Sequence, residues 1–221
     1  VLVGPLPPPS GGMATQTEQF ADLLRLEGAE VTVVAVNAPY RPRWIGRIRG
    51  VRAVFRLVPY VTRLVRAVRR ADVVHVMSNS GWSCHLIAAP AVWIAHSKGI
   101  PTIVNYRGGE AAAFLARRSR GVRRTLRQAS VLVVPSGFLH EVFRRFDIDS
   151  LIVPNIVDID RFRPAGELAR PAAAHVVVTR NLEPIYGIPT ALQAFALVRK
   201  SMAAARLTIA GTGPKAVAYC R

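Results

Sequence analysis

Two glycine-bearing segments contain residue types suited to binding an anion or a sugar. Ser10-Gly11-Gly12 lies between the first expected strand and the first expected helix. Gly11 and Gly12 let a ligand approach the backbone closely, and the free N–H groups of the following helix attract anions. The spacing matches neither a dinucleotide fingerprint nor a P-loop. The segment is therefore either a ligand-binding loop or a simple tight turn.

The second segment is Asn105-Tyr106-Arg107-Gly108-Gly109-Glu110, which also follows an expected strand. Polar loops at strand ends carry function more often than they act as spacers. A guanidinium group such as that of Arg107 can hold a phosphate or carboxylate through two hydrogen bonds. We predict Arg107 and Glu110 as catalytic and Asn105 as substrate-binding. The alternative is a surface Arg107 paired with Glu110.

Other chemistries find little support in the sequence. His75, His85 and His96 lack metal-site spacing, and Gly-x-Ser-x-Gly is absent. We therefore predict no metal and no cofactor. Two cysteines make no disulfide framework, which favours a reduced, cytoplasmic setting. The longest apolar stretch, about Leu86 to Ala95, contains Pro90 and is too short for a membrane span.

Short apolar runs alternate with segments of helical length along the chain. The strands and helices that they form must position the two glycine-bearing loops. The first expected helix carries Phe20, Leu23 and Leu24 on one face and ends at Gly28. This alternation predicts an α/β fold with a doubly wound parallel sheet covered on both faces. The expected strands are Val1–Val3, Val31–Val36, Val73–Met77, Thr102–Asn105, Val131–Val134 and Leu151–Val153, with later helices at Trp82–Lys98, Glu110–Gln128 and Phe138–Phe146.

A Pro- and Ala-rich stretch interrupts the alternation, which then restarts. We expect one domain over residues 1–164, a linker over 165–174 and a second domain over 175–221. The second contains a strand at His175–Thr179, a helix at Pro189–Lys200 and a strand at Leu207–Ala210. One such unit is small for an independent core. We expect a chain cut at its front, with a truncated second domain.

The 221 residues carry 30 basic and 13 acidic side chains, a net charge of +17. Ten arginines and no acidic residue lie between Arg41 and Arg70, interleaved with apolar residues such as Trp44 and Phe55. This segment is either a helix whose apolar stripe faces the core or a contact with an anionic membrane. A second arginine cluster, at 117–127, has the same alternatives. Nucleic acid is disfavoured because no recognisable motif accompanies the charge.

Several longer motifs, in this order, resemble retaining glycosyltransferases of family 4, which have the GT-B fold. The resemblance covers essentially the whole chain. Its motifs are the Ser10-Gly11-Gly12-Met13 loop, Pro135-Ser136, Pro154-Asn155-Ile156-Val157-Asp158 through Phe162, Thr179-Arg180-Asn181-Leu182-Glu183-Pro184 through Gly187, and Gly211-Thr212-Gly213-Pro214.

The resemblance implies two Rossmann-like domains, the first binding the acceptor and the second a UDP- or GDP-sugar donor. It implies transfer with retained anomeric configuration, without a metal. Gly11 and Gly12 would border the reacting centre, and Arg180 would contact the donor diphosphate. Asn155 and Asp158 would serve the crossover between domains.

Three departures from the family pattern stand out. Arg107 occupies a position where the family often has His. Tyr186 replaces a phosphate-binding Lys, and we predict it as a substrate-binding residue that donates one hydrogen bond. The family's paired-Glu segment lies beyond Arg221.

We therefore predict a fragment of a hexosyltransferase-type enzyme, inactive alone. Its acceptor is expected to be a sugar or a lipid-linked sugar. We expect it in the cytoplasm, with peripheral contact at the inner face of the membrane. The alternative is a non-catalytic Rossmann-like module that binds a sugar or an anionic lipid.

Overall fold

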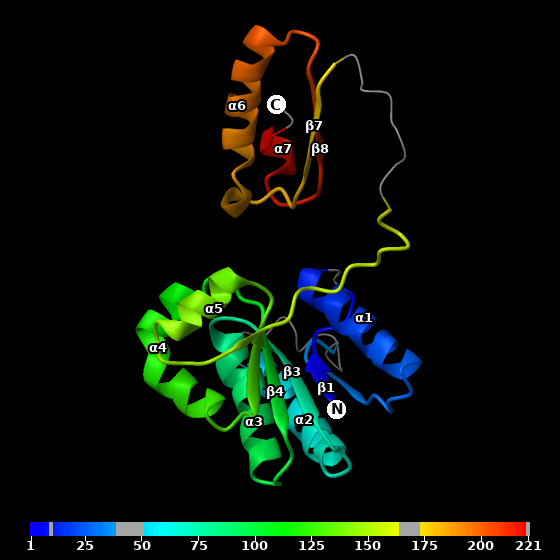
Figure 1. Cartoon of the computed structure of the whole chain (residues 1–221), viewed down its shortest axis with the longest axis vertical. Helices are drawn as coiled ribbons and strands as arrows, with labels where there is room; N and C mark the ends of the chain where they lie inside the picture. Colours follow the sequence, from blue (N-terminus) through cyan, green and yellow to red (C-terminus); the bar gives the residue numbers. More distant parts are fainter. Residues whose placement is uncertain (9–10, 39–50, 164–172, 220–221) are drawn as a thin grey trace. The chain divides into compact units, whose positions relative to one another are not determined.

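The computed structural model describes residues 1–8, 11–38, 51–163 and 173–219, without the side chains of 51–54 and 118–119. The chain divides into two compact units, Val1–Asp158 and Ile159–Arg221 (Figure 1). Trp44 and the first part of the basic stretch lie outside the described residues. Within the described ranges, no helix combines the length and apolarity needed to cross a membrane.

Unit 1 is built on a parallel sheet with strand order β2-β1-β3-β4-β5-β6. The expected α/β fold with a parallel, Rossmann-like sheet is confirmed. All five pairings between neighbouring strands are parallel, so helices must return the chain between them. The strands are β1 (Leu2–Gly4), β2 (Val33–Ala35), β3 (Val74–Ser78), β4 (Thr102–Tyr106), β5 (Val131–Val134) and β6 (Leu151–Ile152).

Helices cover both faces of this sheet, but more of them pack on one face than on the other. Alternate strand residues point to opposite faces. Val3, Val76 and Val104 pack with four helices: α2 (Val51–Val68), α3 (Ala89–His96), α4 (Ala111–Leu126) and α5 (Gly137–Arg144). Leu2 and Met77, on the other face, pack with α1 (Gly12–Leu26). The larger core therefore lies on the α2–α5 side.

Helix α2 directs an apolar stripe into that larger core. Tyr60, Leu64 and Val68 are almost fully buried at helical spacing, and Tyr60 OH donates to the Ile87 carbonyl at 2.7 Å. The core-facing alternative therefore holds for this part of the basic segment. Phe55 and Val58 point elsewhere, with 49% and 57% of their surface exposed.

The buried face of α1 includes the expected Phe20, which packs against the core, but not Leu23. Ala14, Thr17 and Ala21 are buried, whereas Leu23 is 44% exposed. The reason is a close approach of helix to strand: a Cβ on Gly4 would lie 2.7 Å from Thr17 Oγ1. Small side chains permit this contact, and larger apolar residues are displaced to the flanks.

The expected single helix over Trp82–Lys98 is divided. A π-helical segment, η2 (Cys84–Ala88), precedes α3. Pro90 lacks the N–H that an α-helix needs, and its ring would collide with the carbonyl one turn earlier. The wider turn before the proline avoids that collision.

Unit 2 contains β7 (His175–Thr179) and β8 (Arg206–Ala210), which form a parallel pair. Helix α6 (Ile188–Ser201) connects them in the sequence. A 3-10 turn, η3 (Pro184–Tyr186), precedes α6, and α7 (Ala216–Tyr219) follows β8. Leu182, Ile188 and Ala205 are buried among its described residues. Its two strands are mostly exposed, as a single strand–helix–strand unit requires.

Candidate functional site

The carboxyl ends of β1, β3, β4 and β5 lie at one edge of the parallel sheet of unit 1. Open α/β sheets bind ligands at this edge. The loop after β1 leads to Gly11, the N-terminal capping residue of α1, and to Gly12. A Cβ added at Gly11, Gly12 or Gly109 would meet no atom of the described residues within 4 Å. Packing against the described part of the chain therefore does not require these glycines.

The loop after β3 contributes two polar residues that the sequence analysis did not single out, Asn79 and Ser80. Gly108 packs so closely on them that a Cβ would lie 2.6 Å from Ser80 Oγ. Ser80 Oγ also lies 2.6 Å from Tyr106 OH, and burial raises the pKa of Tyr106 to about 12. The signal available in the sequence was Ser-Asn-Ser-Gly directly after an expected strand.

Arg107 is the centre of a hydrogen-bond network at this edge. Its Nε donates to Asn105 Oδ1 at 3.2 Å, and its Nη1 donates to Gln16 Oε1 at 3.1 Å and to Asn155 Oδ1. Burial lowers the pKa of Arg107 from its ordinary value. The structure thus brings Asn155 together with Arg107 and Asn105, so residues predicted for the site from two separate segments lie in one network.

Gln16, on helix α1, was missed by the sequence analysis and completes this network. Its Nε2 donates to the Ile156 carbonyl at 2.9 Å, and its Oε1 accepts from the Ile156 N–H at 3.0 Å. The side-chain amide therefore pairs with Ile156 as a neighbouring strand would. The partners are 140 positions apart, so no local pattern indicates the contact.

His75, on strand β3, extends the network beneath helix α1. Arg107 Nε can only donate, so the oxygen of Asn105 faces it and the amide NH₂ faces His75 Nε2, 3.2 Å away. His75 Nε2 must therefore accept. Its ring packs against Phe20 with centroids 4.7 Å apart. Burial, helped by the charge of Arg107, lowers the pKa of His75 to about 4.

The other predicted residues of unit 1 lie around this network. Glu110 is exposed in the turn before α4, and the ion pairs found among the described residues do not include the alternative pairing of Glu110 with Arg107. Asp158 is exposed and is the last residue of unit 1. Ser136 caps helix α5 by accepting from the Leu139 N–H.

In unit 2, Arg180 and Tyr186 lie together. The Arg180 guanidinium carbon is 5.6 Å from the centre of the Tyr186 ring, a cation–π arrangement. The loop after β8 packs against the same segment: a Cβ on Gly211 would overlap the Arg180 carbonyl, and Leu182 N–H donates to the Thr212 carbonyl at 2.9 Å. The loops that follow β7 and β8 therefore hold each other in place.

A parallel α/β sheet with glycine-bearing loops at its carboxyl edge defines a Rossmann-like binding domain. The chain belongs to Glycosyltransferase Family 4, since the sequence profile of that family matches residues 10–161. This confirms the resemblance seen in the sequence, and the fold of unit 1 is consistent with a GT-B domain. Comparison with curated proteins gave no match.

Membership of this family supports a glycosyltransferase-type function with sugar donor and acceptor substrates. Within the described residues, no three His, Cys, Asp or Glu side chains are grouped in a way that could hold a metal ion.

The depressed pKa of His75 predicts acid sensitivity. Its ordinary value is 6.5, against about 4 in the folded chain, so the unfolded chain binds more protons between these pH values. The free energy of unfolding should therefore fall by about 3 kcal/mol as the pH decreases from 6.5 to 4. Urea unfolding at several pH values measures this. His75→Leu should flatten the dependence in that window, and an unchanged slope would contradict the assignment.

The pairing of Gln16 with Ile156 predicts local protection of the Ile156 amide. Gln16→Ala removes the acceptor of this N–H and should speed its hydrogen exchange by about fivefold, because one hydrogen bond contributes about 1 kcal/mol. Exchange monitored by NMR measures the effect. Gln19→Ala is the matched control, since Gln19 contacts the Gln16 amide. Equal exchange rates in both variants would argue against the pairing.

Proposed function

We propose that this chain is part of a retaining glycosyltransferase that moves a hexose from a UDP- or GDP-linked donor to a sugar or lipid-linked acceptor. The family match over residues 10–161 carries this proposal. Residues 1–164 form the acceptor-binding domain, 165–174 the linker, and 175–221 belong to the donor-binding domain.

The acceptor binds at the carboxyl edge of the sheet in unit 1. The backbone of Gly11 and Gly12, at the N-terminus of α1, binds the acceptor. Asn105 lies below it and accepts a hydrogen bond from Arg107. The exposed carboxylate of Glu110 accepts a hydrogen bond from an acceptor hydroxyl. The Arg107 guanidinium supplies positive charge at the reacting centre while it holds Asn155. Asn155 and Asp158 belong to the segment that connects the acceptor-binding domain to the donor-binding domain.

The donor diphosphate binds beside Arg180. Its planar guanidinium group lies over the Tyr186 ring, 5.6 Å from the ring centre, and can bind phosphate oxygens through paired N–H groups. The Tyr186 hydroxyl donates one further hydrogen bond. The developing negative charge on the leaving diphosphate is stabilised by such fixed donors.

Arg180→Ala in the full-length protein should lower donor-dependent transfer. A hydrogen bond to a charged group contributes about 1.5–3 kcal/mol, so kcat/KM should fall roughly 10- to 100-fold. Steady-state assays with UDP- and GDP-sugars measure this. Arg199→Ala, which removes an exposed arginine of α6, is the control and should have little effect. Unchanged turnover in folded Arg180→Ala would remove this residue from the donor site.

We also propose peripheral contact with an anionic membrane through the outer face of α2. Phe55 and Val58 are exposed there with Arg56, Arg63 and Arg66. Apolar side chains enter the headgroup boundary of a bilayer, and flanking arginines attract anionic lipids.

The triple variant with Arg56, Arg63 and Arg66 replaced by Gln should bind anionic vesicles roughly one-hundred-fold more weakly. Each basic residue near such a surface contributes about 1 kcal/mol. Vesicle co-sedimentation measures the partition. The control replaces Arg25, Arg144 and Arg145 by Gln. It removes the same number of charges, but from arginines that form ion pairs with carboxylates. Equal losses in the two variants would leave α2 with a packing role alone.

A further inference from the structure

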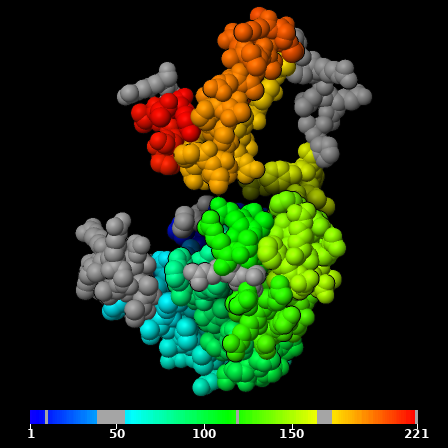
Figure 2. Space-filling model, turned by 90° about the vertical axis from the view of Figure 1, so that its left-hand side faces the viewer, coloured from blue at the N-terminus to red at the C-terminus, as the bar shows by residue number. Residues whose placement is uncertain are grey.

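Four arginines share one face of the second half of helix α4. Arg120, Arg123, Arg124 and Arg127 follow the spacing i, i+3, i+4, i+7, which places them side by side on a helix. With Gln128 they line a single cavity of about 520 Å³. We call these four residues the arginine quartet. Figure 2 views unit 1 from the side on which α4 (green) is exposed.

The charges of the quartet are poorly compensated. No acidic residue occurs between residues 111 and 140. In the part of the chain that the structure describes, the quartet has one ion pair, from Arg123 to the exposed Asp147 at 3.7 Å. Asp149 borders a neighbouring cavity with Arg123 and Arg127, but neither carboxylate lines the quartet's cavity. Arg120 and Arg124 border only the latter cavity among those described.

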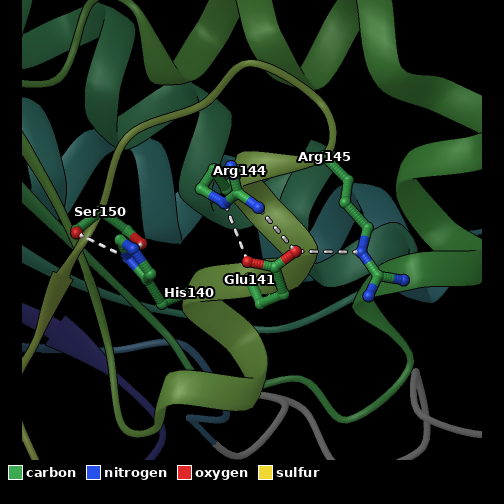
Figure 3. Close-up of polar contacts among 5 residues, drawn as sticks. All are labelled: His140, Glu141, Arg144, Arg145 and Ser150. Atoms are coloured by element: carbon green, nitrogen blue, oxygen red, sulfur yellow. Dashed lines mark hydrogen bonds and ion pairs between the residues drawn. The ribbon is translucent and has the colours of Figure 1, made fainter.

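Helix α5 shows how this protein compensates arginines elsewhere. Glu141 accepts from Arg144 Nε at 2.8 Å, from Arg144 Nη2 at 3.0 Å and from Arg145 Nε at 3.4 Å, as Figure 3 shows. Those two arginines are held by a carboxylate one turn away. The quartet lacks such a residue on its own helix.

Two of the quartet side chains are positioned by neighbouring groups. Arg124 makes a cation–π contact with Trp93 of α3, with its guanidinium carbon 5.6 Å from the ring centre, and Trp93 Nε1 donates to Thr125 Oγ1 at 3.3 Å. Arg123 Nε is buried and, among the described residues, has no hydrogen-bond partner. The position of Arg124 is therefore set by Trp93, and the stem of Arg123 is buried against the protein.

The quartet lies away from the candidate site. Helix α4 begins beside the carboxyl end of β4, and its second half leads to the start of β5. Because the strands are parallel, residues 120–128 lie near the opposite edge of the sheet from Gly11 and Gly12. A ligand of the quartet is therefore separate from the sugar acceptor.

We propose that the arginine quartet binds a phosphate group carrying two negative charges, borne by a soluble phosphate ester or by a lipid headgroup. Like charges at i, i+3 and i, i+4 destabilise a helix, and a bound dianion relieves that repulsion. Guanidinium groups bind phosphate oxygens through paired, charge-assisted hydrogen bonds. The neighbouring carboxylates disfavour an anion at Arg123 and Arg127, so Arg120 and Arg124 carry most of the contact.

The first test titrates the whole chain with inorganic phosphate by calorimetry, with ionic strength held constant by sodium chloride. Saturable binding is expected, and R120Q/R124Q should weaken it at least about tenfold. R144Q/R145Q loses the same charge from arginines held by Glu141 and should change the affinity less than about twofold. Far-UV circular dichroism and thermal unfolding establish that both variants are folded. Absence of saturable binding, or equal losses in both variants, would overturn the proposal for soluble phosphate.

The second test identifies the source of the phosphate group. Phosphatidylcholine vesicles containing phosphatidic acid present a phosphate monoester, and vesicles with the same fraction of phosphatidylserine present a comparable charge without it. Tighter binding to phosphatidic acid, lost in R120Q/R124Q but kept in R144Q/R145Q, would support a lipid headgroup. Equal binding to both vesicles together with saturable inorganic phosphate would support a soluble ester. Failure of both tests would refute the site while leaving glycosyl transfer and the α2 contact untouched.

Discussion

The segment Pro154–Ile156 leaves the sheet at β6 without entering another strand, and polar side chains from elsewhere in unit 1 bind it. The amide of Gln16 supplies both a donor and an acceptor to Ile156, and Arg107 holds the neighbouring Asn155. Arg107 is in turn fixed by Asn105, whose amide faces His75 in the interior. Helix α1, two central strands and the segment that leads out of unit 1 are therefore coupled through five polar side chains. A displacement of any of them disturbs the edge at which the glycine-bearing loops lie.

The distribution of charge adds a second constraint. A net charge of +17 alone does not distinguish biased composition from a binding surface. The described residues separate two groups of arginines. Arg25, Arg144 and Arg145 have carboxylate partners within 3.4 Å, whereas the described side chains of α4 make one ion pair, from Arg123 to Asp147 at 3.7 Å. Composition biases an entire chain, but the absence of carboxylates on one helix face is a local property that needs its own explanation.

The sequence was sufficient where structure depends on neighbouring residues. The β-branched runs Val131–Val134 and His175–Thr179 form strands with the expected bounds. The expectation for Leu23 on α1 was wrong because the approach of Gly4 to Thr17 favours small side chains such as Ala14 and Ala21 on the buried face. Gln16 was missed because its partner lies far along the chain. The partners of Arg107 on α1 and beyond β6 are likewise distant in the sequence, so no local pattern indicates them.

The contact between Gly4 and Thr17 has a mechanical consequence. The Thr17 side chain packs directly on the backbone of β1 at Gly4, so a larger residue at either position would push α1 away from the sheet. The N–H groups at the start of α1 belong to the same helix, so such a displacement would also move them at the edge where Gly11 and Gly12 lie.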